Sequence, residues 1–191
     1  SLFPSAPSRW GPDGRSAEYD DWRSEVEHKA QRLFGHVPRL FLSPDPFTGF
    51  RSIPGSEQPV KFKPLGLWYS CGIEWIVWLT HEMPEWLAEA NYLYEIDLRL
   101  DRMVQIRTAS QIDAFTQKYQ GGSTIRGETR TEKIRWDAVA RTYDGIEICP
   151  YISSRRMSNS SQWYYTWDVA SGCIWNASAL AGVRLLARPD R

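Results

Sequence analysis

The sequence predicts a single α+β domain, and three observations support that fold class. The chain has 191 residues, a length that suits one domain able to bury a core. Hydrophobic residues make up 42% and charged residues 24%, a globular balance that excludes a disordered or fibrous chain. Segments with helical spacing and segments with alternating polarity follow one another along the chain, which indicates helices and strands within one fold.

The first part of the chain predicts an arm, a helix and a series of strands. Residues 1–21 are rich in Pro, Gly, Ser and Asp and are expected to form a loose arm, with the domain spanning residues 22–191. Apolar side chains recur at helical spacing over residues 22–34, and Gly35 ends this helix. Strands are expected over residues 40–42, 50–53 and 66–70.

The remaining elements are predicted from the same two periodicities. A helix is expected over residues 73–90, with Pro84 as a kink or a restart, and residues 92–100 alternate as a half-buried strand does. Further helices are expected over 111–119 and 136–143, and further strands over 103–106, 145–151, 163–168, 172–176 and 183–187. Polar residues over 120–135 predict a loop or an exposed hairpin, and those over 153–161 predict a second loop.

Charge and hydropathy argue against two classes of protein. Lys and Arg number 23, and so do Asp and Glu, so the formal charge of zero disfavours a duplex-DNA binder that depends on electrostatics. No run of about 18 apolar residues occurs, so no transmembrane helix is expected. The first residues do not resemble a signal peptide, and we expect a cytoplasmic protein that does not bind membranes.

Aromatic and sulfur-containing residues give two further expectations. Aromatic residues reach 14%, with 10 Trp and 9 Tyr, which suits both a core and a ligand site, and most are expected in the core. The three cysteines are far apart and form no C-x-x-C, so we expect buried thiols in a reducing compartment. The three His and three Cys do not cluster, so no metal site is predicted.

Most nucleotide and hydrolase motifs are missing, but the order of several segments is informative. No G-x-G-x-x-G, P-loop, G-x-S-x-G or H-E-x-x-H is present. The segments in question are K-P-L-G-L-W-Y-S (63–70), L-Y-E-I-D-L-R-L-D-R-M-V-Q-I (93–106), W-D-A-V-A-R-T-Y-D-G-I-E-I (136–148) and W-D-V-A-S-G-C-I-W-N (167–176). Their order over roughly residues 36–180 resembles the ADP-ribosyltransferase superfamily, in particular its divergent phage and bacterial members.

This resemblance implies a compact split β-sheet with short flanking helices and an enzyme that cleaves NAD at the nicotinamide–ribose bond. NAD is then a co-substrate, no metal is required, and ADP-ribose passes to a macromolecular acceptor. Such proteins act as toxins or phage–host effectors and can have a neutralising partner protein. The family's glutamate or glutamine two residues before the catalytic glutamate is absent, because Gly145 stands two before Glu147. The acceptor is therefore left open and includes nucleic acid.

The family pattern also implies particular site residues. Ser70 matches the central serine, and Trp68 and Tyr69 would offer a face to the nicotinamide ring. The phosphate-holding residue would be Arg51, or else Arg39 or His36, with Lys63 also on the cofactor side. The late acidic residue would be Glu147 or Asp168. The chemistry suits these types, because a carboxylate stabilises the oxocarbenium-like transition state, an aromatic face attracts the cationic ring, and arginine binds phosphate.

Alternatives remain for the function and for each candidate residue. Glu147 could face outward on an edge strand, Asp168 could be only a hydrogen-bonding group, and Trp68 could belong to the core. The second function hypothesis is a non-enzymatic module that holds single-stranded nucleic acid by stacking on aromatic rings. Arginines of the two polar loops would bind the phosphates in that case, and would bind the acceptor if the chain is an enzyme: Arg126, Arg130, Arg155 and Arg156.

Overall fold

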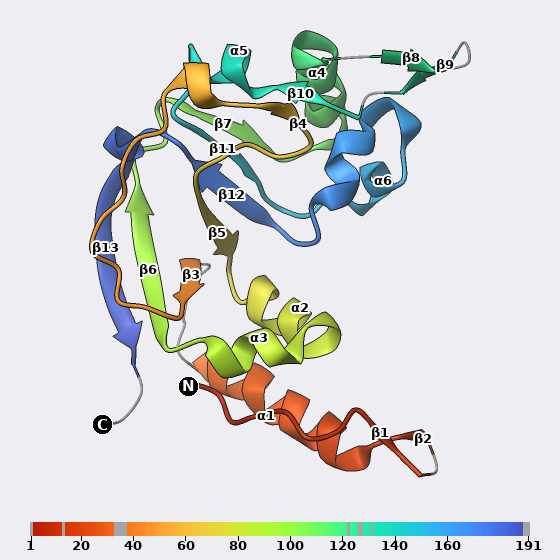
Figure 1. Ribbon diagram of the computed structural model, residues 1–191, viewed down its shortest axis with the longest axis vertical. Helices are drawn as coiled ribbons and strands as arrows, with labels where there is room; N and C mark the ends of the chain where they lie inside the picture. The colour runs from red at the N-terminus through yellow and green to blue at the C-terminus, as the bar shows by residue number, and fades with distance from the viewer. Residues whose placement is uncertain are drawn as a thin grey trace. The chain divides into compact units, whose positions relative to one another are not determined.

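The computed structural model describes residues 2–12, 14–32, 38–121, 123–125, 128–130 and 132–188. Within these residues the chain forms a mixed seven-stranded sheet in the order β13-β6-β3-β5-β12-β11-β7, together with several helices (Figure 1). The predicted α+β class is therefore confirmed. None of the described helices combines the length and the apolar character that a membrane span needs.

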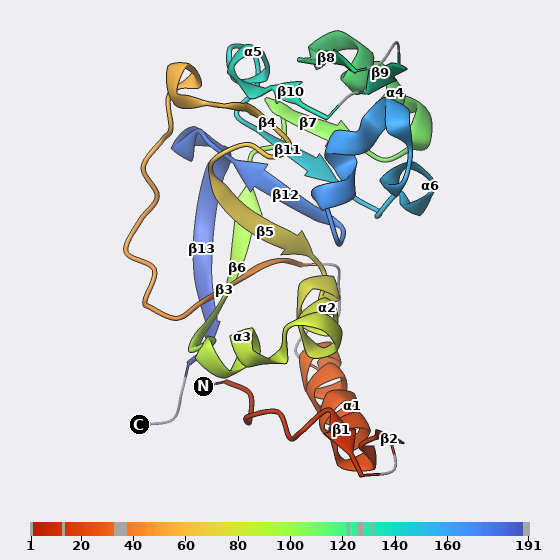
Figure 2. The same cartoon turned by 45° about the vertical axis from the view of Figure 1, so that its right-hand side comes forward.

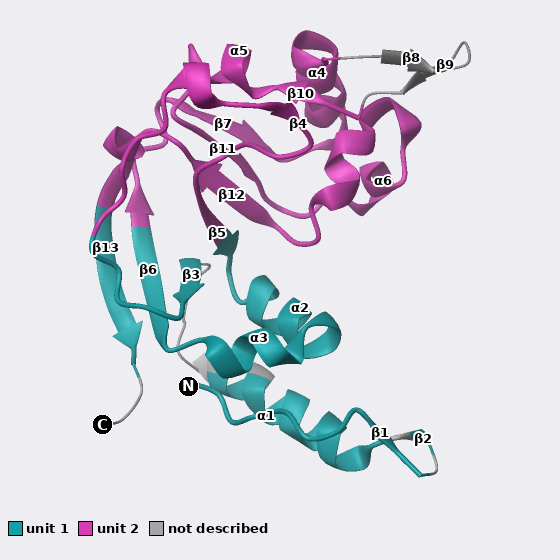
Figure 3. Cartoon of the chain, in the orientation of Figure 1, with its two compact units in different colours: residues 1–48, 70–96, 182–191 teal, residues 49–69, 97–181 magenta. Residues whose placement is uncertain are grey.

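The chain divides into two compact units (Figure 3). Unit 1 consists of residues 1–48, 70–96 and 182–191, and unit 2 consists of residues 49–69 and 97–181. The chain passes between the units four times. One passage lies between Thr48 and Gly49, and the other three lie inside the strands β5 (Leu67–Cys71), β6 (Tyr92–Leu98) and β13 (Leu180–Ala187).

In its described residues, unit 1 contains three helices and the antiparallel pair of β3 (Arg39–Ser43) with β6. Helix α1 (Ala17–Arg32) lies beside α2 (Glu74–Glu82) in Figures 1 and 2, and Pro84 starts a separate helix, α3 (Pro84–Glu89). Proline restarts the helix here because it lacks the N–H that a helix interior needs but fits the first turn. The core of unit 1 is formed by Phe3, Tyr19, Trp22, Val26, Leu40, Ile76, Leu79, Leu87 and Leu93.

The N-terminal segment differs from a simple arm. Phe3 is buried in the core of unit 1, and the amide of Leu2 donates a hydrogen bond to the carbonyl of Ala90 at 2.9 Å. Two short strands, β1 (Trp10–Gly11) and β2 (Gly14–Arg15), pair antiparallel, and α1 begins at Ala17 rather than at Trp22. Proline and glycine content alone did not reveal that the burial of Phe3 and hydrogen bonds from Leu2 to Ala90 and from Trp22 to Pro4 anchor this segment.

Unit 2 is built on β7 (Met103–Ile106), β11 (Gly145–Ile148) and β12 (Ser171–Ile174). Strand β11 pairs parallel with β7 and antiparallel with β12, so it is an interior strand. Helices α4 (Ala109–Tyr119), α5 (Trp136–Ala140) and α6 (Ser153–Arg156) belong to the same unit. Helix α4 begins with a capping box, in which Thr108 and Gln111 satisfy each other's backbone amides.

The core of unit 2 is rich in tryptophan. Trp136, Trp163, Trp167 and Trp175 are all buried, as the composition predicts for most of the aromatic residues. The indole of Trp163 donates a hydrogen bond to the hydroxyl of Thr116 at 2.8 Å. Such a partner is needed because a buried N–H without an acceptor is costly.

Smaller elements complete unit 2. The 3-10 helices are η1 (Gly55–Glu57), η2 (Asn159–Thr166) and η3 (Ala177–Ala179). Strand β4 (Val60–Lys61) pairs with β10 (Ile134–Arg135). Strand β8 (Ser123–Ile125) pairs antiparallel with β9 (Glu128–Arg130), as the hairpin alternative predicts for the described part of residues 120–135.

Two predicted strands are wrong. Residues 50–53 form no strand, and residues 163–166 belong to the 3-10 helix η2. The buried residues Trp163, Tyr164 and Trp167 follow a spacing of one and then three, which suits a helical turn and not an alternating strand. The predicted loop over residues 153–161 likewise contains the short helix α6.

Candidate functional site

The strongest candidate site in unit 2 joins two predicted residues, Tyr69 and Glu147. Tyr69 lies on β5, and its hydroxyl donates a hydrogen bond to Oε2 of Glu147 on β11 at 2.8 Å. The Glu147 side chain is buried, with 6% exposed. Because β11 lies between β12 and β7, the alternative that Glu147 faces outward from an edge strand is wrong.

A glycine on the intervening strand makes this contact possible. Gly172 on β12 is the register partner of Glu147 on β11. A Cβ atom at Gly172 would lie 2.2 Å from the Oη of Tyr69 and 2.3 Å from its Cζ. The absence of a side chain therefore lets the phenol cross β12, a case in which glycine inside a strand marks the close approach of another group.

The pair lies on the face of the strands opposite to the core of unit 2. Ile146 and Ile148 belong to the core, so Glu147, between them, points the other way. Trp68 packs against that core and meets Trp167 edge to face at 5.0 Å, whereas Tyr69 points to the Glu147 side. Trp68 and Tyr69 therefore do not form one ring-binding surface, contrary to the prediction, because neighbouring strand residues alternate between faces.

A second group of predicted residues lies around Trp68. The ammonium of Lys63 lies over the Trp68 ring, 5.3 Å from its centroid. Asp168 forms an ion pair with Arg156 at 3.3 Å, and both side chains are partly exposed. The Arg156 guanidinium also lies over the ring of Tyr165, 5.5 Å from its centroid. Four predicted residues, Lys63, Trp68, Arg156 and Asp168, thus come from one unit and adjoin one another.

Burial and nearby charges shift the pKa of Lys63 in this second group and that of Tyr151. Burial lowers the pKa of Lys63, and the charge of Asp168 partly opposes that effect. Burial raises the pKa of Tyr151, while the charges of Arg156 and Asp168 act on it in opposite directions. Asp168 therefore interacts with two cations, Arg156 and Lys63.

The candidates for the first two parts of the family pattern, a phosphate-holding residue and a serine, do not all lie in one unit. Ser70 is buried in unit 1, where its hydroxyl donates to the carbonyl of Gly72 at 3.0 Å. Arg51 is exposed and belongs to unit 2, and Arg39 lies on β3 of unit 1. The third alternative, His36, lies outside the described residues.

The predicted basic loops are partly neutralised. Arg155 forms a bidentate ion pair with Asp113, with both contacts at 2.8 Å. This hydrogen-bonded pair lowers the pKa of Asp113 and raises that of Arg155. Arg126 and the side chain of Arg130 lie outside the described part of the chain.

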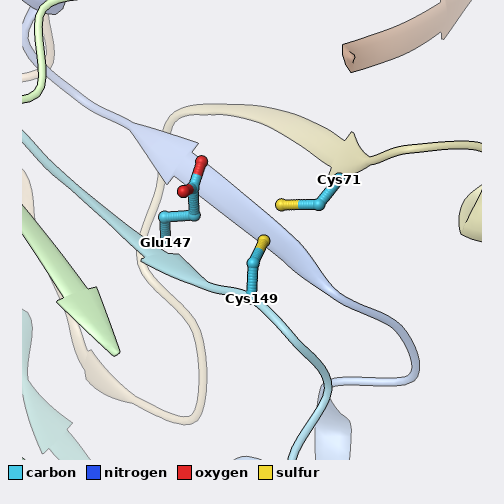
Figure 4. A group of neighbouring side chains, drawn as sticks. All are labelled: Cys71, Glu147 and Cys149. Atoms are coloured by element: carbon cyan, nitrogen blue, oxygen red, sulfur yellow. The ribbon is translucent and has the colours of Figure 1, made fainter. Parts of the chain in front are cut away.

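The cysteines differ from the predicted set of three buried thiols. Cys173 is a free, fully buried thiol, and burial raises its pKa well above the ordinary value. Cys71 and Cys149 are disulfide-bonded, so the thiol interpretation is wrong for these two. Figure 4 draws Cys71, Glu147 and Cys149, whose side chains are of types that ligate metal ions. Because a disulfide sulfur is not a thiolate ligand, we assign no metal to these residues.

Sequence reasoning missed three residues that complete these groups. Gly172 could have been suspected as a glycine inside a predicted strand. Asp113 carries no local signal, because its partner Arg155 is 42 positions away along the chain. Tyr151 is close to Arg156 in the sequence, but the effect of that charge on it depends on the fold.

No protein-family model matches this chain, and neither a curated protein nor a solved structure matches it. Between the acidic candidates of the two groups, Glu147 is buried and accepts a hydrogen bond from Tyr69, whereas Asp168 is partly exposed.

Proposed function

We propose that this chain is an NAD-dependent ADP-ribosyltransferase, or an NAD glycohydrolase of the same kind, in which Glu147 is the late acidic residue. The observation that carries the proposal is the hydrogen bond between Tyr69 and the buried Glu147, which lie on two interior strands of the seven-stranded sheet. Loss of nicotinamide places positive charge on the ribose, and a fixed carboxylate lowers the energy of that charge where it develops.

The environments of the two acidic candidates favour Glu147 over Asp168. The hydrogen bond from Tyr69 orients the Glu147 carboxylate, which is buried on an interior strand. Asp168 instead pairs with Arg156 and interacts with Lys63, which weakens its ability to stabilise a further cation. Interior strands also hold a carboxylate more rigidly than a loop does, and fixed groups stabilise a transition state at less reorganisation cost.

Roles for the other predicted residues follow from their positions. Ser70 matches the central serine of the family pattern, but its buried hydroxyl is bonded to the Gly72 carbonyl, so we assign it no contact with the reacting atoms. The Lys63 ammonium already occupies one face of Trp68, and Trp68 points away from the Glu147 side, so we do not assign the nicotinamide ring to Trp68. Arg51 is accessible for a phosphate of NAD.

The nucleic-acid module is the weaker proposal. Its phosphate contacts would come from Arg155 and Arg156, and both are paired with carboxylates, Asp113 and Asp168. A macromolecular acceptor, a toxin or phage effector role and a neutralising partner protein remain predictions. Cytoplasmic location is also a prediction, and the disulfide-bonded state of Cys71 and Cys149 argues against a reducing compartment.

The test is release of nicotinamide from labelled NAD by the purified chain, with and without a cell extract as the source of acceptor. We expect release by the unmodified chain and a loss of about a hundredfold or more in Glu147→Gln, as for removal of other charge-stabilising groups. The matched control is Asp168→Asn, which should retain most of the activity. Absence of release from well-folded protein with every acceptor would overturn the proposal.

A further inference from the structure

The outer strand of the seven-stranded sheet has an unpaired edge. β13 is eight residues long and ends the strand order, and no other strand of the described residues pairs with its outer side (Figure 1). An edge strand presents a row of N–H and C=O groups that can pair with another chain. Short length, prolines and charges usually prevent such pairing, and β13 has eight residues, no proline and one charged residue, Arg184.

One face of β13 is also apolar and exposed. Ala181, Val183 and Leu185 alternate along the strand and therefore share a face. Val183 is 36% and Leu185 is 43% exposed, both large for aliphatic side chains on a strand. Arg184 lies on the other face of β13, and its positive charge is paired with the carboxylate of Glu95 on β6 of the same unit.

We propose that β13 pairs antiparallel with β13 of a second copy of this chain. The proposed register places Val183 of one copy opposite Val183 of the other, so both copies make the same contacts. Ala181 then faces Leu185, which keeps the apolar face continuous across the two copies. Each Arg184 lies opposite Gly182, so no like charges face each other across the interface. The strand is therefore self-complementary in sequence as well as in its backbone.

The area that two paired β13 strands bury limits the affinity of the dimer. Stable interfaces bury roughly 1,200 Å² or more, and one pair of strands buries less than that. Self-association is therefore weak and depends on protein concentration. This inference does not depend on the proposed enzymatic activity, so a failure of either leaves the other standing.

Sedimentation equilibrium of the full chain over a wide range of concentration tests the proposal. We expect a monomer–dimer equilibrium that the double substitution Val183→Lys and Leu185→Lys weakens by about tenfold or more, since charges on an edge strand oppose pairing. The control is Trp86→Lys, which places the same charge at an exposed apolar position of α3 and should leave the equilibrium unchanged. Circular dichroism establishes that each variant is folded.

Cysteine cross-linking tests the register. Val183→Cys should form a dimer through this residue on mild oxidation, because opposite residues of paired strands lie within reach of a disulfide. Arg184→Cys should not, because its counterpart would be two positions away along the partner strand. A chain that stays monomeric at all concentrations, a dimer that the lysine pair does not weaken, or cross-linking by Arg184→Cys alone would overturn the proposal.

Discussion

The hydroxyl of Tyr69 reaches the carboxylate of Glu147 across β12, and this contact depends on Gly172 having no side chain. Three strands that are distant in sequence therefore contribute one residue each to the same arrangement. The pair places a buried carboxylate at a defined position, which is the feature that the proposed chemistry requires. Tyr69, Glu147 and Gly172 can each be substituted separately, so the role of each can be tested.

Gly172→Ala should displace the tyrosine. The added Cβ would lie 2.2 Å from Tyr69 Oη, far inside contact distance, so the phenol must move away from Glu147. We expect a loss of about 1–3 kcal/mol in the free energy of unfolding, as for other overpacked interiors, together with loss of nicotinamide release. Chemical denaturation measures the first effect. Gly55→Ala is the control, since its Cβ would meet Ala140 at an ordinary 3.5 Å. Equal behaviour of the two variants would contradict the assignment.

Tyr69→Phe should remove the hydrogen bond while keeping the ring. Loss of a donor to a buried carboxylate is expected to cost about 1–3 kcal/mol in the free energy of unfolding. If Tyr69 orients Glu147 for the reaction, the variant should also lower kcat for NAD cleavage more than it changes KM. Urea denaturation and steady-state kinetics give the two values. Unchanged stability and unchanged kcat would show that the hydrogen bond has no role.

The tryptophan core of unit 2 should dominate its stability. Trp163 is fully buried and bonded to Thr116, so Trp163→Ala should lower the free energy of unfolding by about 3–5 kcal/mol. Trp86 on α3 is 50% exposed, and Trp86→Ala should change the free energy of unfolding by only about 0.5 kcal/mol. Denaturant titrations of both variants make the comparison. Similar losses at the two positions would be inconsistent with the described burial.

Cys173 should be unreactive in the folded protein. Burial raises the pKa of its thiol, so thiolate does not form in the ordinary range for cysteine. A thiol reagent at mildly alkaline pH should modify it only after denaturation. Because its folded-state pKa is above the unfolded value, the stability of the fold should fall as pH rises past the ordinary thiol pKa. Fast modification of native protein at Cys173 would disagree with this burial.

The pair of Arg155 and Asp113 should contribute to stability only above acidic pH. Its hydrogen bonds lower the pKa of Asp113 in the folded state, so the contribution is complete above the ordinary carboxyl range and is lost as pH falls through the lowered value. The effect should be small because the pair is exposed to solvent. Thermal unfolding as a function of pH should show a shallower acid dependence in Arg155→Gln than in the control Arg51→Gln. Parallel profiles would contradict the prediction.

The periodic parts of the fold could be predicted from the sequence. The alternation after Tyr92 gave β6, and Pro84 gave the restart at α3, because both depend on local spacing. The segment around Trp163 was misassigned, since a cluster of aromatic residues suits a strand as well as a 3-10 helix. Spacing of the buried positions decides between them, and burial is not known from the sequence.

The candidate site was only partly predictable for a related reason. Residue types suggested Tyr69 and Glu147, but their contact requires the strand order and the absence of a side chain at Gly172. Alternation along β5 could have shown that Trp68 and Tyr69 face opposite ways. The pairing of Arg155 with Asp113 depends on tertiary structure, because the two residues are 42 positions apart.

Nicotinamide release from NAD by the unmodified chain and by Glu147→Gln, measured side by side on folded protein, tests the central claim most directly. Turnover by the first and near-complete loss in the second, with Asp168→Asn still active, is the result expected. Equal rates in the unmodified chain and Glu147→Gln, or loss in Asp168→Asn alone, would contradict the role given to Glu147.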